Sequence, residues 1–209
     1  METPLIGLVM ATMTEAKPLI LGLSLDEMHG GPFRVFRDSR VALMVSGVGK
    51  VHAAMATAHL VASFHPALLC NIGAAGALDE ERPLGSLYHI HRIIEPDRPD
   101  LATGAFMEHS PDVLDGFPLA SLATQDRPLR SPEERAGVVG LADLVDMEGA
   151  AVVQAARQFG LGCYVFKFVS DTPRHDARGA IIENIRRCRD GQTPFFQEKV
   201  LPALYEAMG

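Results

Sequence analysis

Three short, predominantly apolar runs, at residues 5–11, 67–72 and 163–169, constrain the fold of this chain most strongly. Runs of this length without polar alternation are typical of strands that a parallel sheet buries on both faces. Residues 51–64 and 148–159 are rich in Ala and Val, and Pro66 and Gly160 mark their ends, so both segments are expected to be helices. Alternating strands and helices predict an α/β fold that binds ligands at the carboxyl ends of its strands.

The remaining segments are expected to extend and cover this sheet. Residues 33–36 and 41–45 have the pattern of a hairpin, and 84–94 and 119–123 that of two further strands. Thr14 is expected to cap a helix with Pro18 in its opening turn, so that Glu15 follows the first strand directly. Residues 95–117, rich in Pro, Asp and Gly, predict a long surface loop. Further helices are expected from Ser131 and over residues 177–188 and 194–208.

Length, composition and charge narrow the class of protein. With 209 residues, 47% of them hydrophobic, and no repeat or linker, the chain is expected to form one domain over residues 1–209. A net charge of −7 without any Lys/Arg block argues against nucleic acid as a partner. The first apolar run is too short for a membrane span, and three widely spaced cysteines fit a reducing compartment. We therefore expect a cytoplasmic protein that binds a small molecule.

Acidic side chains and glycines collect where the predicted strands end. Glu15 follows the first strand, and Ser170-Asp171 closes the last one. Residues 46–49 and 73–76 are glycine-rich segments at two further strand ends, and Met147 and Glu148 open a helix. Each feature alone has a structural explanation, since acids offset helix dipoles, Asp favours turns and caps, and glycine permits tight turns. Together they predict a site at one edge of the sheet.

Several common kinds of site are disfavoured. The glycine segments match neither the dinucleotide fingerprint nor the P-loop, and no serine or cysteine lies in a nucleophile elbow. His89 and His91 alternate on a predicted strand, which would place both on one solvent-facing side. No third metal ligand accompanies them, so we expect no metal site.

Five ordered segments resemble the superfamily of nucleoside phosphorylases and nucleosidases, and within it the 5′-methylthioadenosine/S-adenosylhomocysteine nucleosidases. The similarity runs over most of the chain. It implies an α/β/α sandwich around a central mixed, largely parallel, twisted sheet. The segments are Ile6-Gly7-Leu8 with Glu15, residues 45–51, residues 71–76, residues 145–151 and Val169-Ser170-Asp171.

The resemblance implies cleavage of the N-glycosidic bond of a purine nucleoside, with no metal or organic cofactor. Asp171 would be the general acid that protonates the base at N7, and it must itself be protonated in the complex. Glu15 would orient and deprotonate the attacking water. Glu148, with its neighbour Asp146, would hold the ribose hydroxyls. The residues expected to contact substrate are Val48, Ala74, Ala75, Gly76, Met147, Glu148, Lys167 and Ser170.

Some positions depart from the family pattern. Lys167 stands where the family usually has Arg, and Ala74 where it often has Ser. The segment Asp126-Arg127-Pro128-Leu129 occupies the place where a Phe usually follows an Asp and stacks on the purine. The family also implies a homodimer, with the 95–117 excursion near the site of the partner.

Two other functions stay open on the sequence. A phosphorylase would use inorganic phosphate in place of water, and Arg34, Arg37 or Arg40 could reach the phosphate, from a partner subunit if not from this one. Glu15 would repel that anion. Residues 126–128 with 146–148 nevertheless resemble phosphorylases that act on adenosyl-hopane lipids. The second alternative is a nucleoside-binding protein without catalysis, for which the retained set of acids would be unnecessary.

Overall fold

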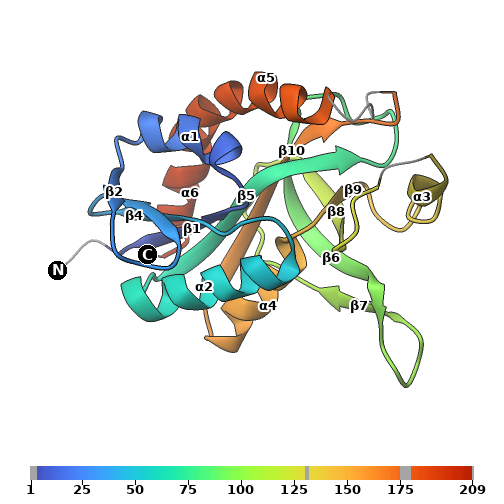
Figure 1. Ribbon diagram of the computed structural model, residues 1–209, viewed down its shortest axis with the longest axis horizontal. Helices are drawn as coiled ribbons and strands as arrows, with labels where there is room; N and C mark the ends of the chain where they lie inside the picture. Colours follow the sequence, from blue (N-terminus) through green and yellow to red (C-terminus); the bar gives the residue numbers. More distant parts are fainter. Residues whose placement is uncertain (1–3, 130–131, 175–179, 209) are drawn as a thin grey trace.

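The computed structural model describes residues 4–129, 132–174 and 180–208 (Figure 1). A mixed sheet of ten strands forms its centre, with helices on both sides. The strands are β1 Ile6–Met10, β2 Asp26–Met28, β3 Arg34–Arg37, β4 Val41–Val45, β5 Leu68–Ala77, β6 Leu87–Pro99, β7 Phe106–His109, β8 Leu119–Thr124, β9 Leu144–Asp146 and β10 Gly162–Asp171. The helices are α1 Met13–Gly22, α2 Lys50–Phe64, α3 Pro132–Ala136, α4 Gly149–Gln158, α5 Ala180–Phe195, the π-helical turn η1 Phe196–Val200 and α6 Leu201–Glu206.

The sheet combines a parallel centre with a closed end. Parallel pairings join β4, β1, β5 and β10, and the β2–β3–β4 meander adds antiparallel strands at the β4 side. Strand β5 pairs with both β10 and β9, so the order β5–β10–β6–β8–β9 returns to β5 as a ring. This confirms the mixed α/β sheet, and the ring gathers the carboxyl ends of β5, β8, β9 and β10 at one place.

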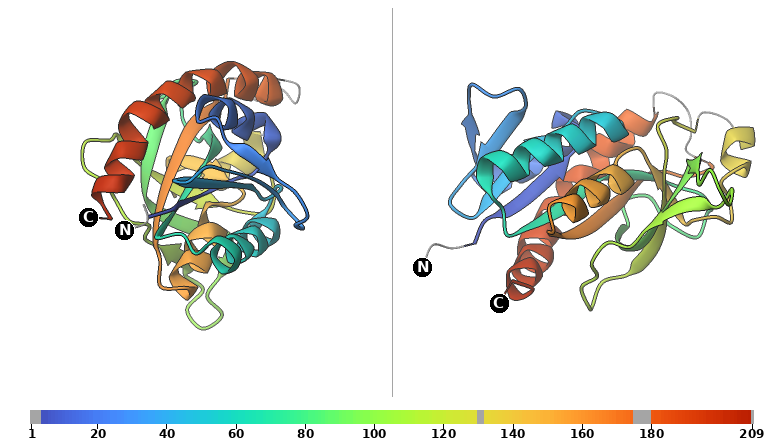
Figure 2. Two further views of the ribbon diagram at one scale, coloured as in Figure 1. Left: turned by 90° about the vertical axis from the view of Figure 1, so that its left-hand side faces the viewer. Right: turned by 90° about the horizontal axis from the view of Figure 1, so that it is seen from below.

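Two hydrophobic cores, one on each face of the sheet, explain the continuous apolar runs. Strand β1 shows the division, because Val9 belongs to the core under α2 and α4 whereas Leu8 and Met10 belong to the core under α1, α5 and α6. All five of its residues are buried. Figure 2 shows the two helical layers from two further sides. The three apolar runs of the sequence therefore become β1, β5 and β10, as predicted.

The opening of α1 differs from the prediction. Thr12, not Thr14, is the N-cap, and it forms a reciprocal capping box with Glu15. Pro18 consequently lies inside the helix, beyond the first turn. A Thr followed three residues later by Glu is the stronger cap signal, and the prediction overlooked it.

Two further predictions are wrong because tertiary contacts override local sequence. Residues 95–117 are not one long loop, since β6 continues to Pro99 and pairs with β7 as a hairpin that projects from the sheet (Figure 1). The break between two C-terminal helices is absent, because α5 passes through Gly191 and Pro194 into η1 and α6. Phe196 and Val200 pack this continuous helical segment into the core. Ser131 and Ala177, the expected starts of two helices, lie outside the described residues.

Candidate active site

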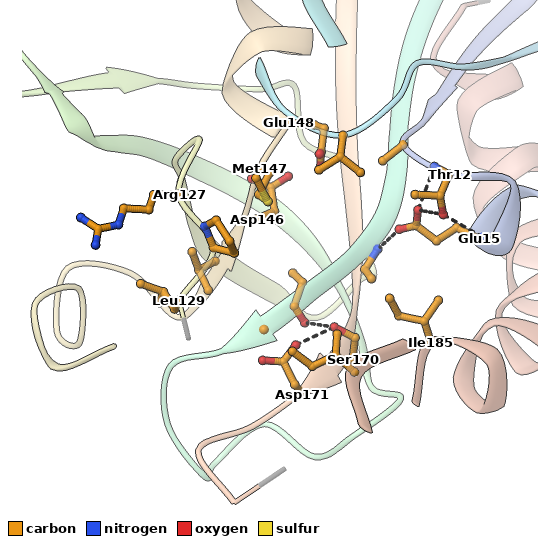
Figure 3. A pocket seen from close by; sticks show the side chains of 18 residues that line it. Thr12, Glu15, Arg127, Leu129, Asp146, Met147, Glu148, Ser170, Asp171 and Ile185 are labelled. Atoms are coloured by element: carbon orange, nitrogen blue, oxygen red, sulfur yellow. Dashed lines mark hydrogen bonds between the residues drawn. The ribbon is translucent and has the colours of Figure 1, made fainter. Parts of the chain in front are cut away.

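A cavity of about 200 Å³ opens at the carboxyl ends of the central strands (Figure 3). Acidic side chains enter it from α1, β9 with the start of α4, and β10, while most of the remaining wall is apolar. The lining residues are Ala11, Thr12, Glu15, Val48, Ala74, Ala75, Gly76, Arg127, Pro128, Leu129, Val145, Asp146, Met147, Glu148, Ser170, Asp171, Ile181 and Ile185.

Glu15 is held rigidly at one side of the cavity. Its Oε2 accepts hydrogen bonds from the hydroxyl of Thr12 at 2.6 Å and from the backbone N–H of Thr12 at 3.0 Å. Its Oε1 accepts from the N–H of Ala74 at 2.8 Å, across from β5. A Cβ at Gly73 would lie only 3.1 Å from Oε1. Helix capping and a strand glycine together fix this buried carboxylate.

Glu148 lies at the start of α4 and is also buried. Its Oε1 accepts a hydrogen bond of 2.8 Å from the N–H of Gly49, at the beginning of α2. Gly49 has a φ of +99°, a conformation that favours glycine. Burial raises the pKa of Glu148 to about 7, with further repulsion from Asp146, although Lys167 and the Gly49 N–H oppose the rise. The side chain is therefore able to bind or release a proton near neutral pH.

Asp146 and Lys167 form a buried ion pair at the floor of the cavity. Lys167 Nζ lies 2.8 Å from Asp146 Oδ2, and both side chains are almost fully buried. Burial alone would lower the pKa of Lys167, but Asp146 and Glu148 outweigh it and raise the pKa. Asp146 also accepts from Thr124 Oγ1 at 2.6 Å and from the N–H of Gly149 at 2.8 Å. Both oxygens of Asp146 are thus engaged within the protein, and its expected part in holding the ribose stays a prediction.

Asp171 occupies the opposite end, at the carboxyl end of β10. Its Oδ1 accepts a hydrogen bond of 2.8 Å from Ser170 Oγ, and its Oδ2 lies 3.2 Å from Nη2 of Arg135. A Cβ at Gly76, its neighbour on β5, would come within 2.7 Å of Oδ2. Residues 73–76 belong to an extended strand, so the prediction that their glycines make a tight turn is wrong. Those glycines leave room for the carboxylates of Glu15 and Asp171.

The predicted histidine pair cannot hold a metal. His89 is buried, with its Nδ1 hydrogen-bonded to the Val165 carbonyl and its Nε2 accepting from the N–H of Leu114. The register of β6 shifts between Ile90 and Arg92, so His91 is exposed on its own. Among the described residues, no group of three His, Cys, Asp or Glu side chains is arranged to bind a metal ion.

Comparison with known protein families finds one family whose model matches the sequence of this chain. The model of the phosphorylase superfamily matches residues 6–131 and 121–193 of the chain. The chain belongs to the phosphorylase superfamily.

Two proteins similar in sequence to this chain carry the same name. A 5′-methylthioadenosine/S-adenosylhomocysteine nucleosidase of Marinomonas is 24% identical over 188 residues, which cover 78% of this chain and 81% of the relative. A protein of the same name from Staphylococcus saprophyticus is 29% identical over 164 residues, 67% of this chain and 72% of the relative.

Solved structures establish the fold of this superfamily member. A Helicobacter pylori 5′-methylthioadenosine/S-adenosylhomocysteine nucleosidase has a TM-score of 0.83 at 19% identity, covering 96% of this chain and 99% of that one. The Neisseria meningitidis protein of that name, in complex with methylthio-immucillin-A, has a TM-score of 0.82 at 21% identity, covering 97% and 100%. Helicobacter pylori futalosine hydrolase also has a TM-score of 0.82 at 19% identity, covering 95% and 97%.

The structure of the superfamily member brings nearly all predicted site residues together. Asp171, Glu15 and seven of the eight expected substrate contacts line the cavity, and Lys167 lies beneath it. Their chemical roles stay predictions. The sequence analysis missed Thr12, Ile181, Ile185 and Arg135. The spacing of Ile181 and Ile185, one helical turn apart, is a signal for a shared face, but nothing local to Arg135 points to Asp171.

Every described helix of this superfamily member is too short or too polar to cross a lipid bilayer.

The three arginines predicted as candidates for binding phosphate, Arg34, Arg37 and Arg40, lie outside the cavity lining. Arg34 pairs with Glu27 at 2.9 Å, Arg37 donates to the Asp38 carbonyl, and Arg40 lies over the Tyr205 ring.

Proposed function

We propose that this protein is a purine nucleosidase that hydrolyses the N-glycosidic bond of an adenine nucleoside such as 5′-methylthioadenosine or S-adenosylhomocysteine. The observation that carries the proposal is the placement of Glu15, Glu148 and Asp171 around one cavity, from three separate elements. The names of the relatives support the substrate class. In the proposed mechanism, each carboxylate acts on a different part of the reaction.

Glu15 acts on the attacking water. Its contacts with Thr12 and Ala74 hold the carboxylate against the cavity and leave lone pairs for one more donor. Oriented in this way, it removes a proton from water as the water attacks the ribose carbon. This step needs a rigid base, because a small misplacement of the reacting atoms costs much of the rate.

Glu148 binds the ribose, and Met147 packs against the sugar. One oxygen of Glu148 is occupied by the Gly49 N–H, so the other is available for hydroxyl donors. An ionised carboxylate accepts hydrogen bonds more strongly than a protonated carboxyl group, and Glu148 has a pKa of about 7. Substrate binding therefore strengthens as the pH rises through neutrality.

Asp171 protonates the departing base. The C–N bond breaks with its electron pair moving onto the purine, and a proton on N7 neutralises the charge that develops there. Pro128 and Leu129 line the same cavity and provide an apolar wall for a purine in place of the usual aromatic ring.

Hydrolysis fits the described site better than phosphorolysis. A phosphate nucleophile needs cationic side chains, and Arg127 is the one guanidinium in the described lining of the cavity. Its side chain is 81% exposed, pairs with Glu134 at 3.1 Å and extends away from the carboxylates (Figure 3). Glu15 occupies the nucleophile side and would repel phosphate.

A panel of purified nucleosides tests the proposal. The panel contains methylthioadenosine, adenosylhomocysteine, adenosine, inosine and a futalosine-type nucleoside, each with and without phosphate, and free base is scored by chromatography. We expect adenine release from the first two without phosphate. Base release that requires phosphate would instead identify a phosphorylase. Binding measured by calorimetry, without base release over hours, would identify a nucleoside-binding protein.

We also propose that the protein is a homodimer. Val48, which precedes α2, and Val51 and Met55, on one face at the start of α2, expose 49%, 66% and 59% of their surface beside the cavity. Apolar side chains grouped on one helical face suit a subunit interface. Light scattering coupled to size-exclusion chromatography measures the mass, and Val51→Asp with Met55→Asp should give monomers.

A further inference from the structure

A closed set of contacts ties the start of α2 to the end of β6 and to the loop after β8. Asp126 Oδ1 accepts a hydrogen bond of 2.8 Å from the backbone N–H of Lys50, the first residue of α2. The N–H of Asp126 donates to Oδ2 of Asp97 at 2.9 Å, and Oδ1 of Asp97 lies 2.7 Å from Nζ of Lys50. Lys50, Asp97 and Asp126 thus form a rim triangle, in which each residue contacts the other two.

The arrangement of the strands and of α2 explains why the residues of the rim triangle meet. Strands β6 and β8 are parallel, and Ile94 pairs with Ala123. Asp97 and Asp126 each follow three residues after these paired positions, so they lie at matching places on the two chain segments. Two neighbouring carboxylates repel each other, but the ammonium of Lys50 and the positive end of the α2 dipole offset the repulsion.

Lys50 connects the rim triangle to the protein interior. Its Nζ also lies 3.0 Å from Oε2 of Glu95, whose side chain is only 1% exposed. Glu95 accepts a further hydrogen bond of 3.0 Å from Gln154 on α4. Asp97 and Asp126 are themselves exposed, so their contacts should add little to the free energy of unfolding. The main consequence of the rim triangle is that it fixes the position of the loop after β8.

The rim triangle joins two walls of the cavity. On one side, Gly49 directly precedes Lys50, and its N–H donates to Oε1 of Glu148 at 2.8 Å. A Cβ at Gly49 would lie 3.3 Å from Oδ1 of Asp126, so the backbone and the carboxylate are closely packed. On the other side, residues 127–129 directly follow Asp126 and line the cavity (Figure 3). Two consecutive N–H groups therefore contact the proposed ribose ligand and the residue that begins the proposed purine wall.

We propose that Asp126 is a positioning residue, which together with Lys50 and Asp97 holds the wall of residues 127–129 in a fixed place relative to Glu148. The inference rests on the proposed function. A nucleoside spans both walls, because its purine lies on one and its ribose hydroxyls bind the other. Free adenine needs only the purine wall. Loss of the rim triangle should therefore impair reaction of the whole nucleoside more than binding of free adenine.

Two substitutions break the rim triangle at different contacts. Asp126→Ala removes the acceptor for the Lys50 N–H, and kcat/KM for adenine release from methylthioadenosine should fall by about tenfold. Asp97→Asn should act in the same direction, because both oxygens of Asp97 accept hydrogen bonds and an amide offers one oxygen. Asp126→Asn keeps an oxygen for the Lys50 N–H and should restore most of kcat/KM.

The experiment compares the whole nucleoside with free adenine. Steady-state kinetics give kcat and KM for methylthioadenosine, and calorimetry gives the Kd of free adenine, which should change by less than about twofold in Asp126→Ala. Asp38→Ala is the matched control, because Asp38 Oδ1 also accepts from backbone N–H groups, of Arg40 and Val41 at 2.7 Å each, outside the described cavity lining. It should keep the wild-type kcat/KM. Equal losses for the nucleoside and for free adenine in Asp126→Ala, or an unchanged kcat/KM, would overturn the proposal.

A double variant tests whether the contacts act together. Asp97→Asn with Asp126→Ala should lose little more kcat/KM than either single variant, because residues of one network are not additive. Losses that multiply would show two independent effects and would also overturn the proposal. Failure of wild-type protein to release any base would instead count against the proposed function, which this comparison keeps separate.

Discussion

The two ends of the cavity differ in the balance of carboxylates and cations. At the end that holds Glu15 and Glu148, these carboxylates and Asp146 surround one described cation, Lys167. At the other end, the carboxylate of Asp171 pairs with the guanidinium of Arg135. The crowded end raises the pKa of Glu148 to about 7, mainly through burial and then through Asp146. Carboxyl groups at the two ends thus have different charged neighbours, and variants at each end test the contrast.

The largest effect is expected at the end of the cavity that holds Asp171. Asp171→Asn keeps the shape and the contact with Ser170 but cannot transfer a proton, so turnover should fall by about 10²–10⁴ with ligand affinity roughly retained. Steady-state kinetics and calorimetry measure both. Asp112→Asn, which alters an aspartate paired with Arg157 at 2.9 Å outside the cavity lining, is the control and should keep its rate. Unchanged turnover in Asp171→Asn would remove Asp171 from the mechanism.

The next largest effect is expected at the crowded end. Lys167→Met removes the buried cation and leaves Asp146 beside Glu148 without compensation, which should cost about 3–5 kcal/mol of unfolding free energy. Urea denaturation measures the loss. Lys50→Met is the matched control, because Lys50 bridges Glu95 and Asp97 with 15% of its side chain exposed. Equal losses in both variants would contradict a special role for the buried cluster.

How far the sequence predicts this site depends on how local each signal is. The strand ends were predictable, because the residues that form a buried strand and those that form the helix after it are adjacent in the sequence. Glu15, Glu148 and Asp171 were found in this way. The extension of β5 through Ala77 was not, because it depends on pairing with β9 and β10, which lie more than sixty residues further along the chain. Arg135 was missed for the same reason, since its contacts depend on where α3 places it relative to the ends of β5 and β10.

Individual residues were also misread where tertiary structure decides burial. His89 belongs to a predicted strand with polar neighbours, yet its ring stacks on Phe166 at a centroid distance of 4.2 Å in the interior. Lys167 interrupts an apolar run, which is a signal that a buried charge needs partners. The partner, Asp146, came from the predicted acidic segment, but the sequence cannot say that the two meet.

A smaller effect is expected for two buried glutamates, Glu148 and Glu95. Their contributions to the unfolding free energy should depend on pH with opposite sign. Because the pKa of Glu148 is raised from 4.5 to about 7, the folded protein binds an extra proton between these values, and stability falls as pH rises through them. Glu148→Gln removes this loss, so it should raise the unfolding free energy at alkaline pH by on the order of 1 kcal/mol while weakening activity. Thermal unfolding at acidic and alkaline pH measures the difference.

Glu95 is the matched comparison, because it is equally buried but has four donors. Burial alone would raise its pKa, but hydrogen bonds from His109 and Lys50, with the charges of Lys50 and Arg98, lower the pKa overall. Its contribution to stability is therefore present above the usual carboxyl range and lost as pH falls. Glu95→Gln should destabilise the protein at alkaline pH, opposite to Glu148→Gln. The same sign in both variants would contradict the assigned charge balance.

The smallest expected effect tests how Thr12 holds Glu15, the proposed general base. Thr12→Ala removes the cap of α1 and the 2.6 Å hydrogen bond to Glu15, which should cost about 1 kcal/mol of stability. Glu15 keeps the N–H donors of Thr12 and Ala74, so turnover should fall less than about tenfold at a nearly unchanged KM. Thr12→Ser restores the hydroxyl and should restore both quantities. A hundredfold loss of turnover without any loss of stability would show instead that the Thr12 hydroxyl contacts the reacting atoms, since Thr12 itself lines the cavity.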